Sequence, residues 1–519
     1  MMKYLISFDT NIVAATQAKE WGVDTILTLG DDITADLLKL PYPNEPIVFF
    51  IPTVFDPNNS LAYQGVELSL RILMKYIREN RTDIDIVLMG NETDSSFMLH
   101  CAYPNILKIP GIHYIRFNKK TAASYGIPKR AYVDRADYKS YLDNLGLNFP
   151  LTFKSTHSLT NEWCLFKWNS FMGFEKEPSS LMGHLYFEYL ITIEKLVKIR
   201  DKKATEHLRN RLKNIPAARI LIIDDNRGWH TFFYTIFHDN SEIDVQCLGE
   251  DFNKLSYSEI SKQIEDKIQL FNPHVIILDF RLMEDIDADV KDDMKQVSGY
   301  KILSKTIKGN YINPLSSYGR QVIVFTATSR IENILMLREG NADGFILKEK
   351  PENYNGKEIT KQVISKMIST IDTAINRANF LIPLNEKLCE LESLNVSSIS
   401  GLKETINTVL ESVRIITQSN SLNDGTLKLT YLDLFSILEN LKPSHIKNMN
   451  SYIQGNAPNE ILRYWNNIDE MRNALAHGDR NVKINGKKEQ ISVAIIQEWQ
   501  IKLCDFIKQF IAHQLRNNK

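Results

Sequence analysis

The sequence predicts a multidomain fold. Two α/β units, each built on a doubly wound parallel sheet, are combined with helical connectors and a C-terminal helical bundle. Short apolar runs alternate with amphipathic helical stretches in residues 1–119, the same alternation returns in residues 216–352, and residues 400–519 show helical periodicity throughout. Because parallel strands need long crossover connections, such alternation is typical of a parallel sheet.

The N-terminal unit, residues 1–119, has five candidate strands with helical stretches between them. The expected strands are Tyr4–Phe8, Thr25–Leu29, Ile47–Ile51, Ile84–Met89 and Ile112–Phe117. The crossover between the third and fourth strands has the periodicity of a helix with one apolar face, formed by Val66, Leu70, Leu73 and Ile77.

Two helical connectors are expected. Residues 120–215 are rich in aromatic residues at helical spacing, which we interpret as core or interface positions rather than base-stacking positions. This connector should include a long helix over Ser179–Asn214. The helix should end before Pro216, because proline disfavours a helical conformation in the residue before it. Residues 356–394 predict a second connecting helix, and small polar residues link it to the last unit.

The C-terminal unit, residues 400–519, is expected to be a four-helix bundle. Its periodic segments are Leu402–Gln418, Thr430–Leu441, Glu460–His477 and Ile491–Arg516. Since each segment has an apolar face, the four helices can bury those faces against one another.

Composition and charge narrow the possible functions. The chain has 519 residues, of which 43% are hydrophobic and 24% charged, as in soluble globular domains. Its formal net charge is −1, so any contact with RNA must be local. The five cysteines lie too far apart for a C-x-x-C motif, and no apolar run is long enough to span a bilayer. We therefore expect a cytoplasmic protein without a membrane partner.

Acidic residues end two strands of the central unit. The run RILIID is followed by a further Asp, which gives Asp224 and Asp225, and the run HVIILD ends in Asp279. Because ligands bind at the carboxyl ends of parallel strands, we expect the three carboxylates to converge. Like charges held that close need a cation, and an all-oxygen ligand set suits Mg²⁺. Two further strand ends carry the Thr326 hydroxyl and the Lys348 ammonium, so the set can bind a phosphoryl group.

The order and spacing of these residues resemble the receiver domain of two-component response regulators, a flavodoxin-like domain, over Ala217–Pro351. The matching motifs are IIDDN, IILDFRL, SGYKIL, VFTA and NADGFILK. The resemblance implies phosphorylation of Asp279, with Mg²⁺ held by Asp225 and Asp279, by Asp224 through water and by the carbonyl of Arg281. A histidine kinase or a small phosphodonor would supply the phosphoryl group.

The same resemblance implies roles for three further residues. Thr326 and Lys348 would contact the phosphoryl oxygens, and Phe345 falls where the family carries its aromatic switch residue. The chain departs from the family directly after the lysine, where Glu349 and Lys350 precede the proline that usually follows at once.

A second departure is the acidic insertion EDIDADVKDDMK between Asp279 and Ser298. Its acids lack EF-hand spacing, so we interpret the insertion as a solvated loop rather than a second metal site.

The N-terminal unit has the outline of a receiver without its chemistry. Its first strand is followed by one acid, Asp9, and its third strand has no acid at its end. Residues 65–68 resemble the start of the receiver's third helix, and Gly90 follows the fourth strand. We expect a degenerate receiver that is not phosphorylated and that docks a partner or the active receiver, with a small-ligand pocket as an open alternative.

The segment RNALAHG near the end of the third bundle helix carries Arg472, Asn473 and His477. Five residues of helix separate Arg472 from His477 by about 140°, so one copy does not stack them, but two copies related by a two-fold axis can bring them together. Arginine can stabilise a phosphate, and histidine can transfer a proton near neutral pH.

The segment resembles the Arg-x4-His motif of HEPN domains, a helical family that includes metal-independent ribonucleases. The resemblance implies an active site of Arg472, Asn473 and His477 that cleaves RNA through the 2′-hydroxyl, needs no cofactor and is completed in a homodimer. Three other interpretations stay open. In the first, the bundle is a HEPN domain that only binds a partner or dimerises. In the second, it is an unrelated helical bundle. In the third, Gly478 is an ordinary helix C-cap and His477 only ends the helix.

Together these observations predict a signalling effector in which phosphorylation of Asp279 controls a ribonuclease. By analogy, such control would suit a stress response or antiviral (phage) defence. The alternative is a non-enzymatic adaptor that accepts phosphate and whose bundle dimerises or binds a partner.

Overall fold

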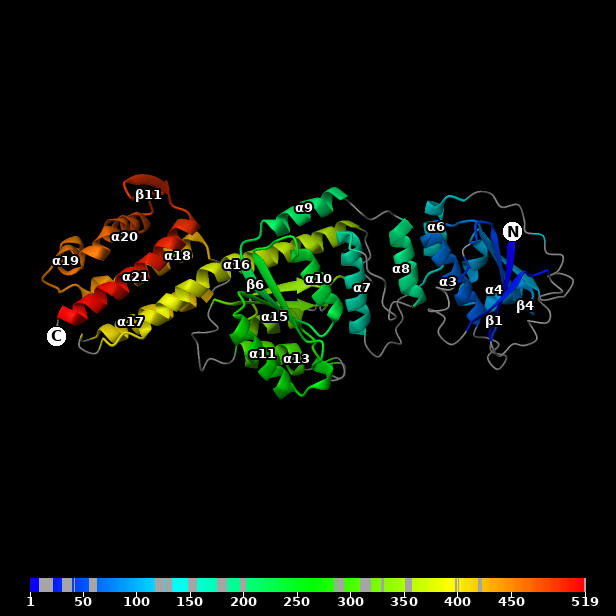
Figure 1. Ribbon diagram of the computed structural model, residues 1–519, viewed down its shortest axis with the longest axis horizontal. Helices are drawn as coiled ribbons and strands as arrows, with labels where there is room; N and C mark the ends of the chain where they lie inside the picture. Colours follow the sequence, from blue (N-terminus) through cyan, green and yellow to red (C-terminus); the bar gives the residue numbers. More distant parts are fainter. Residues whose placement is uncertain are drawn as a thin grey trace. The chain divides into compact units, whose positions relative to one another are not determined.

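The computed structural model in Figure 1 describes most of the chain. The described residues are 1–8, 22–29, 40–41, 43–55, 63–116, 126, 133–147, 156–174, 184–196, 202–283, 287, 294–308, 319–327, 331–350, 357–396, 399, 401–418 and 422–517. They form two compact units: unit 1 is Met1–His207 with Lys348–Ile364, and unit 2 is Leu208–Leu347 with Ser365–Lys519. Across the described ranges, no helix has the length and apolar character needed to cross a membrane.

Unit 1 contains a parallel sheet of five strands in the order β2-β1-β3-β4-β5. The strands are β1 (Met2–Phe8), β2 (Thr25–Leu29), β3 (Ile47–Pro52), β4 (Ile84–Gly90) and β5 (Ile112–Arg116). The five expected strands are confirmed, and their order is that of flavodoxin-like doubly wound sheets.

Helix α3 (Gln64–Arg78) packs on this sheet through the predicted apolar face. The four residues of that face are buried: Val66, Leu70, Leu73 and Ile77. Gly65 opens the helix so close to the end of β3 that an added Cβ would lie 1.8 Å from the Pro52 carbonyl oxygen. A side chain at this position would therefore push the helix off the strand end.

The other helices of this part of the chain are short or belong to the connector. They are α4 (Asp94–His100), the 3-10 turns Pro104–Lys108 and Arg135–Asp137, α6 (Tyr138–Asp143), α7 (Thr156–Met172), α8 (Leu185–Leu196) and α9 (Lys202–Lys213). Trp163, Trp168 and Phe171 of α7 are almost fully buried, as the interpretation of the aromatic residues as core or interface positions predicts. Within the expected helix Ser179–Asn214 the described residues form α8 and α9; residues 197–201 lie outside the described part.

Unit 2 contains a second parallel sheet, ordered β10-β9-β8-β6-β7. Its strands are β6 (Ala218–Ile223), β7 (Ile243–Leu248), β8 (Val275–Asp279), β9 (Gln321–Thr326) and β10 (Gly344–Leu347). The four runs whose ends carry Asp224, Asp279, Thr326 and Lys348 form strands as the sequence predicts, and the strand order repeats that of the first sheet. The predicted fold class of two parallel α/β sheets plus helical regions is thus confirmed.

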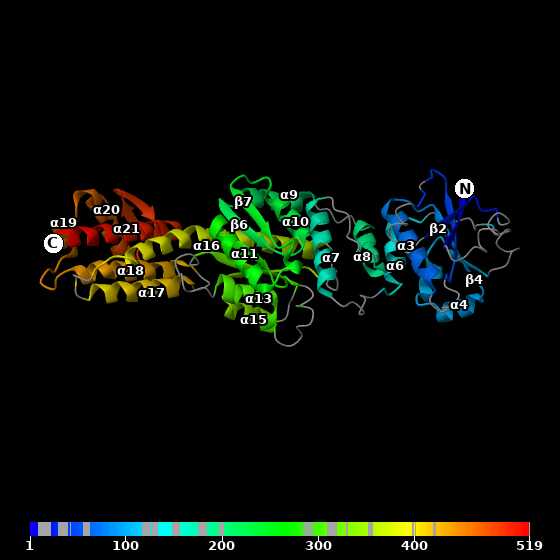
Figure 2. The same ribbon diagram turned by 60° about the horizontal axis from the view of Figure 1, so that its bottom comes forward.

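Helices cover both faces of the second sheet. On one face, Trp229 and Phe233 of α10 (Arg227–Phe237) pack against Phe325 of β9. The other face is covered by α11 (Tyr257–Phe271), by α13 (Ser298–Lys301) with its π-helical continuation Ile302–Ile307, and by α15 (Ile331–Glu339). Figures 1 and 2 both show α11, α13 and α15 grouped on one side of the strands.

The C-terminal part of unit 2 is helical. It comprises α16 (Lys357–Glu392) from Ser365 onward, α17 (Leu402–Gln418), α18 (Asp424–Leu441), α19 (Met449–Asn456), α20 (Asn459–His477), the hairpin β11 (Asn481–Ile484) and β12 (Lys487–Gln490), and α21 (Val493–Asn517). Three of the four predicted segments lie wholly in helices, and the fourth does so from Val493 onward, because Ile491 and Ser492 precede α21. Helix α19 and the hairpin are additions that the four-helix prediction did not include.

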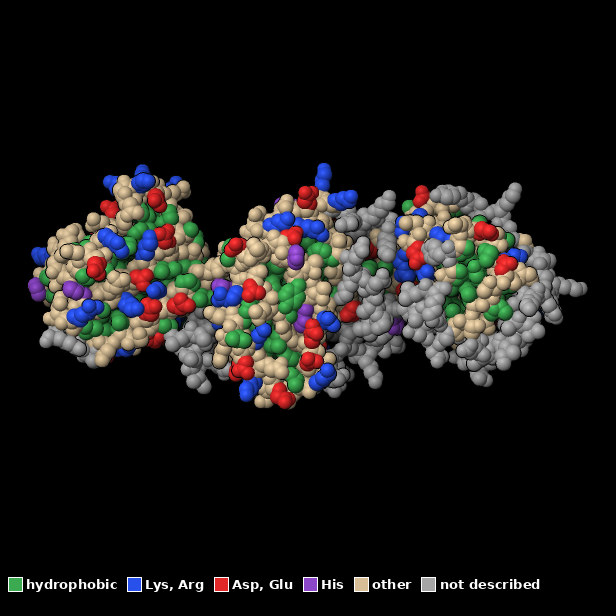
Figure 3. Space-filling view, viewed as in Figure 1, with side chains coloured by type: hydrophobic (Ala, Val, Ile, Leu, Met, Phe, Trp, Pro, Cys, Tyr) green, Lys and Arg blue, Asp and Glu red, His purple; other side chains and the backbone are tan. Residues whose placement is uncertain are grey.

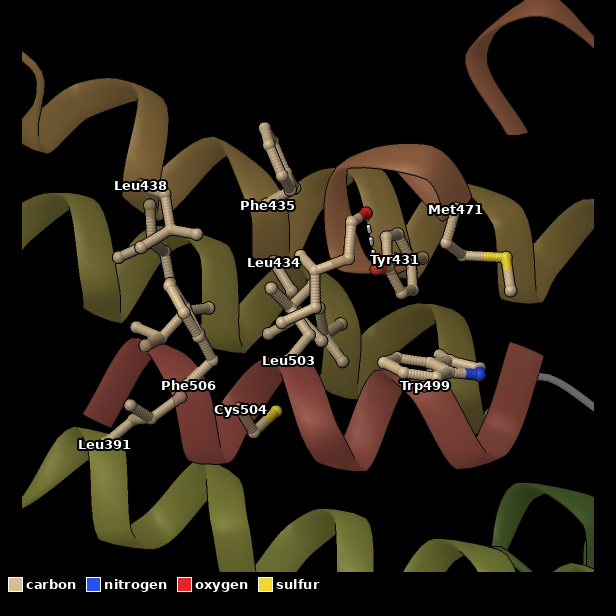
Figure 4. Close-up of a cluster of buried hydrophobic side chains, with 14 of the residues drawn as sticks. Leu391, Tyr431, Leu434, Phe435, Leu438, Met471, Trp499, Leu503, Cys504 and Phe506 are labelled. Carbon is tan, nitrogen blue, oxygen red and sulfur yellow. Dashed lines mark hydrogen bonds between the residues drawn. The ribbon is translucent and has the colours of Figure 1, made fainter. Parts of the chain in front are cut away.

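The bundle core is continuous and apolar. Figure 4 shows side chains of α16, α18, α20 and α21 meeting in it, among them Leu391, Phe435, Met471 and Phe506. The Tyr431 hydroxyl, buried there, donates a hydrogen bond to the Ile468 carbonyl at 3.2 Å, which satisfies the polar group inside the core.

Candidate functional site

Three carboxylates meet at the carboxyl end of the second sheet. Asp224 and Asp225 directly follow β6, and Asp279 is the last residue of β8; the two strands pair in register, Ile223 opposite Leu278. One oxygen of each carboxylate lies within 4.8 Å of the other two. Asp224 and Asp279 are buried and Asp225 is half-buried.

The turn after β6 is held by hydrogen bonds. The backbone nitrogen of Asn226 donates to Asp224 Oδ1 at 2.9 Å. The side-chain oxygen Oδ1 of Asn226 caps α10 by accepting from the backbone nitrogen of Gly228 at 2.8 Å. The buried His230 places Nε2 2.7 Å from the Asp224 carbonyl oxygen. Because a carbonyl can only accept, this nitrogen carries the proton. The bond from Asn226 orients the Asp224 carboxylate, and the other two hold the backbone on either side of Asp225.

Ser298 and Gly299, which follow the acidic insertion in the sequence, hold the loop after β8 in place. The Leu282 nitrogen donates to Ser298 Oγ at 2.9 Å, and the Gly299 nitrogen donates to the Phe280 carbonyl at 3.1 Å. The backbone is therefore held on both sides of Arg281. A Cβ on Gly299 would lie 2.5 Å from the Asp279 carbonyl oxygen, so this approach requires glycine.

Asp287 corrects the interpretation of the acidic insertion. We expected the insertion to be a solvated loop, but Asp287 is fully buried. Its carboxylate accepts hydrogen bonds from the Ser298 nitrogen at 2.8 Å and from Ser298 Oγ at 2.5 Å, and its carbonyl accepts from Arg281 Nη1 at 2.9 Å. A carboxylate with several donors can be buried at acceptable cost, and here it fastens the loop that follows Asp279. Residues 284–286 and 288–293 lie outside the described part of the chain.

The remaining predicted residues lie on or next to the two neighbouring strands. Thr326 ends β9 and is buried, and Leu347 at the end of β10 pairs with it. Lys348 is the next residue of the chain and is 3% exposed. Phe345 pairs with Val324 and packs, partly buried, against the core of the sheet.

The donor set at the three carboxylates fits a hard divalent cation. Mg²⁺ prefers carboxylate and carbonyl oxygens together with water, and two of the three acids here are withdrawn from solvent. Like charges this close repel unless a cation or protons compensate them. Asp224, Asp225, Asp279 and the Arg281 carbonyl are therefore the groups that could hold Mg²⁺.

The first sheet offers a different set of groups at the corresponding place. Its third strand ends in Pro52, and the following Thr53 is buried, with its Oγ1 donating to the Met89 carbonyl at 3.3 Å. No carboxylate follows this strand directly. Asp9, the one acid expected after β1, lies outside the described residues.

The third helix of the bundle carries the Arg-x4-His segment. Arg472 Nη2 forms an ion pair with Glu439 of α18 at 2.9 Å, and Nη1 donates to Asn473 Oδ1 at 2.9 Å. The guanidinium also lies 5.4 Å from the centre of the Phe435 ring. Asp469 accepts a hydrogen bond from Asn473 Nδ2 at 3.4 Å, and burial raises the pKa of its carboxyl. Sequence reasoning missed Glu439, because its partner lies 33 residues away on another helix.

His477 ends the helix and is exposed. Gly478 follows with a φ of 73° as the left-handed cap, and the Asp479 nitrogen donates to the Ala474 carbonyl at 2.8 Å. The expected C-cap is therefore present. Among the described residues, no hydrogen bond or ion pair joins His477 to Arg472, so one copy of the chain keeps them apart, as the helical spacing predicts.

Comparisons with known proteins yield weak likenesses. Neither a protein-family model nor a curated protein sequence matches the chain. The signal receiver domain of a protein described as a Luxo repressor from Vibrio parahaemolyticus is 20% identical, covers 31% of this chain and 93% of its own, and has a TM-score of 0.21. A protein described as a two-component system response regulator/GGDEF domain protein is 8% identical, covers 72% and 99%, and has a TM-score of 0.21. At these scores the site must be judged on its own geometry.

Proposed function

We propose that residues 216–352 act as a receiver domain that is phosphorylated on Asp279 with Mg²⁺ and that this modification controls a metal-independent ribonuclease in the C-terminal bundle. The observation that carries the proposal is the convergence of Asp224, Asp225 and Asp279 within 4.8 Å at the strand ends. A buried hydroxyl, Thr326, ends the strand next to β8. Carboxylates and a hydroxyl at adjacent strand ends are groups that phosphoryl transfer to an aspartate requires, and Lys348 directly follows the next strand in the chain.

In the transfer, one Asp279 carboxylate oxygen attacks the phosphorus of the donor. The bond between phosphorus and the donor oxygen breaks, and that oxygen keeps the electron pair. With acetyl phosphate as the donor, the leaving group is acetate. Bound Mg²⁺ would offset the negative charge of the phosphoryl oxygens and of the carboxylates. Asp225 and the Arg281 carbonyl would help to hold it, Asp224 would act through water, and Thr326 and Lys348 would each contact a phosphoryl oxygen.

Helix α16 supports a physical coupling between the second sheet and the bundle. On the sheet side, Arg377 Nε donates to Gln321 of β9 at 3.0 Å, and Asn379 Nδ2 donates to the Ala217 carbonyl at 3.2 Å. Farther along the same helix, Leu384 and Leu388 are buried in the bundle core. One helix, with Pro383 between the two sets of contacts, thus contacts both parts of unit 2 (Figure 2). A small tilt at the sheet would move the bundle.

In the proposed cleavage, His477 takes the proton of the RNA 2′-hydroxyl as the 2′-oxygen attacks the adjacent phosphorus. The bond from phosphorus to the 5′-oxygen of the next nucleotide breaks, and that oxygen leaves with the electron pair and takes up a proton from solvent. The products are a cyclic phosphate and a 5′-hydroxyl. Arg472 would stabilise the charge on the phosphate. The Glu439 ion pair holds the guanidinium in the free chain, so RNA has to displace that carboxylate, and a second copy has to bring the two side chains together.

The adaptor alternative rests on the same ion pair. The Arg472 guanidinium already contacts Glu439, Asn473 and the Phe435 ring, which is a complete set of structural partners. In that interpretation, Arg472 joins α20 to α18 and the bundle binds another protein. Cleavage of RNA by the wild type, lost in His477→Ala, separates the two proposals.

The phosphorylation step is tested by intact mass. Wild-type protein treated with acetyl phosphate and Mg²⁺ should gain one phosphoryl group, and Asp279→Ala should gain none. Asp266→Ala removes an exposed acid from α11 of the same unit and should label like the wild type. Labelling of Asp279→Ala would show that another residue, in either sheet, accepts the phosphate.

A further inference from the structure

The hairpin β11–β12 has one buried and one exposed face. Val482 and Ile484 are buried in the bundle core, so the hairpin is anchored there. Alternate residues of a strand point to opposite faces, and residues directly opposite each other share a face. The register therefore places four exposed side chains on the outer face, none of them acidic: Asn481, Lys483, Lys488 and Gln490.

Two of these residues carry like charges in opposed positions. Lys483 pairs directly with Lys488 across the two strands. Like charges in this position destabilise a ribbon. Among the described residues, neither side chain takes part in an ion pair that would offset the repulsion. An anion bound between them would turn this repulsion into a favourable interaction.

The hairpin is held in place by polar contacts with α20. The Asn467 side chain donates to Asn485 Oδ1 at 2.8 Å and accepts from the Asn485 nitrogen at 2.9 Å, which fixes the turn. At the other end, the Ile491 nitrogen donates to the Arg480 carbonyl at 3.0 Å and closes the ribbon. Asn485 and Gly486 have φ values of 51° and 78°, as a tight two-residue hairpin turn requires. The lysines are therefore displayed by a rigid ribbon beside the helix that carries Arg472.

The surroundings of the outer face are also positive. Residues 479–490 contain four cations, Arg480, Lys483, Lys487 and Lys488, and two acids, Asp479 and Glu489, which gives a net charge of +2. Figure 3 shows Lys and Arg side chains gathered on the projection that Figure 1 labels β11. This local charge contrasts with the net −1 of the whole chain.

From these features we infer that the outer face of the hairpin binds the phosphate backbone of single-stranded RNA and holds it beside α20. The inference rests on the proposed ribonuclease function, whose substrate it positions. Lysines neutralise phosphates, while the amides of Asn481 and Gln490 can bond to sugar and phosphate oxygens. The outer face has no aromatic side chain on which bases could stack, so binding should depend little on base sequence.

The test uses the full-length chain and a short fluorescein-labelled 2′-O-methyl oligouridine, which cannot be cleaved through a 2′-hydroxyl. Its affinity is measured by fluorescence polarisation over a range of salt concentrations. Lys483→Gln/Lys488→Gln should flatten the slope of log affinity against log salt by about 1.4, because each lost contact with a single strand removes about 0.7. If the contribution of the two lysines to affinity vanishes near 1 M salt, the variant should bind about 25-fold more weakly than the wild type at about 0.1 M.

The matched control, Lys202→Gln/Lys203→Gln, removes two exposed lysines from α9 and should bind like the wild type. The hairpin variant should melt no lower than the wild type, because it relieves the opposed charges. An unchanged affinity and slope in the hairpin variant, an equal loss in the control, or a wild type that does not bind would overturn the inference.

The inference and the proposed function can fail separately. If the oligonucleotide binds through the hairpin but unmodified RNA is never cleaved, the surface stands and the ribonuclease fails. If unmodified RNA is cleaved in a manner that needs His477 while the hairpin variant binds normally, the ribonuclease stands and the surface fails.

Discussion

Replacing Lys167 by Met should strongly destabilise unit 1. Its ammonium is fully buried between two carboxylates, 3.1 Å from Glu194 and 3.6 Å from Glu349. Glu349 in turn accepts a hydrogen bond from the Thr360 hydroxyl at 3.0 Å. Removing this cation leaves the Glu194 and Glu349 carboxylates buried without it, and breaking such a pair costs about 3–5 kcal/mol. In a unit of this size the melting temperature should fall by about 10 °C.

The loss should depend on pH. Burial raises the pKa of Glu194 from its usual 4.5 to about 7, with Lys167 opposing the rise. The folded state therefore binds more protons than the unfolded state, and stability falls as pH rises from about 4.5 to about 7. Without Lys167 the pKa rises further and this window extends upward. The loss of unfolding free energy in Lys167→Met, relative to the wild type, should be largest near pH 8 and should shrink towards pH 5.

Thermal unfolding followed by tryptophan fluorescence suits this test, because Trp163 and Trp168 flank Lys167 on α7. Lys203→Met, an exposed control, should melt like the wild type. Adding Glu194→Gln to Lys167→Met should restore part of the stability. A Lys167→Met melting temperature equal to that of the wild type at pH 8 would refute the account of the buried cluster.

Three further substitutions test the site and the bundle. Gly299→Ala places a Cβ 2.4 Å from the Phe280 carbonyl oxygen, so it should displace the loop after β8 and reduce labelling by acetyl phosphate at least tenfold, measured by intact mass; equal labelling would contradict the role of Gly299 in holding this loop. Asp287→Asn keeps the shape but weakens the charge-assisted bonds to Ser298, so unfolding by urea should show a loss of about 1–3 kcal/mol in unit 2, and an unchanged midpoint would argue against the correction made for the insertion. Glu439→Gln removes the carboxylate that holds Arg472, so RNA cleavage should rise, and no change would indicate that the ion pair does not compete with phosphate.

The sequence was sufficient to predict the sheets, because parallel strands buried on both faces appear as uninterrupted apolar runs. It also placed Asp224, Asp225 and Asp279 at one edge, since acids that end parallel strands meet there. The structure brings these three together, while the roles proposed for Thr326, Lys348 and Phe345 remain predictions.

Other features depended on contacts between distant residues. Asp287 resembles its acidic neighbours in the sequence, and only its pairing with Ser298, 11 residues later, identifies it as buried. Glu439 is one of many acids on helix surfaces until α18 and α20 are packed together. The hairpin did have a local signal, the Asn485–Gly486 pair between residues of alternating polarity. The helical periodicity on both sides of it led us to predict only helices in this unit.

The central claim is that phosphorylation of Asp279 controls RNA cleavage by Arg472 and His477. The most direct measurement is the cleavage rate of a labelled RNA by the full-length chain with and without acetyl phosphate, with Asp279 occupancy determined by mass in the same samples. We expect the cleavage rate to change with occupancy, to stay at one level in Asp279→Ala and to vanish in His477→Ala. Equal rates in the unmodified and the fully phosphorylated protein would contradict it.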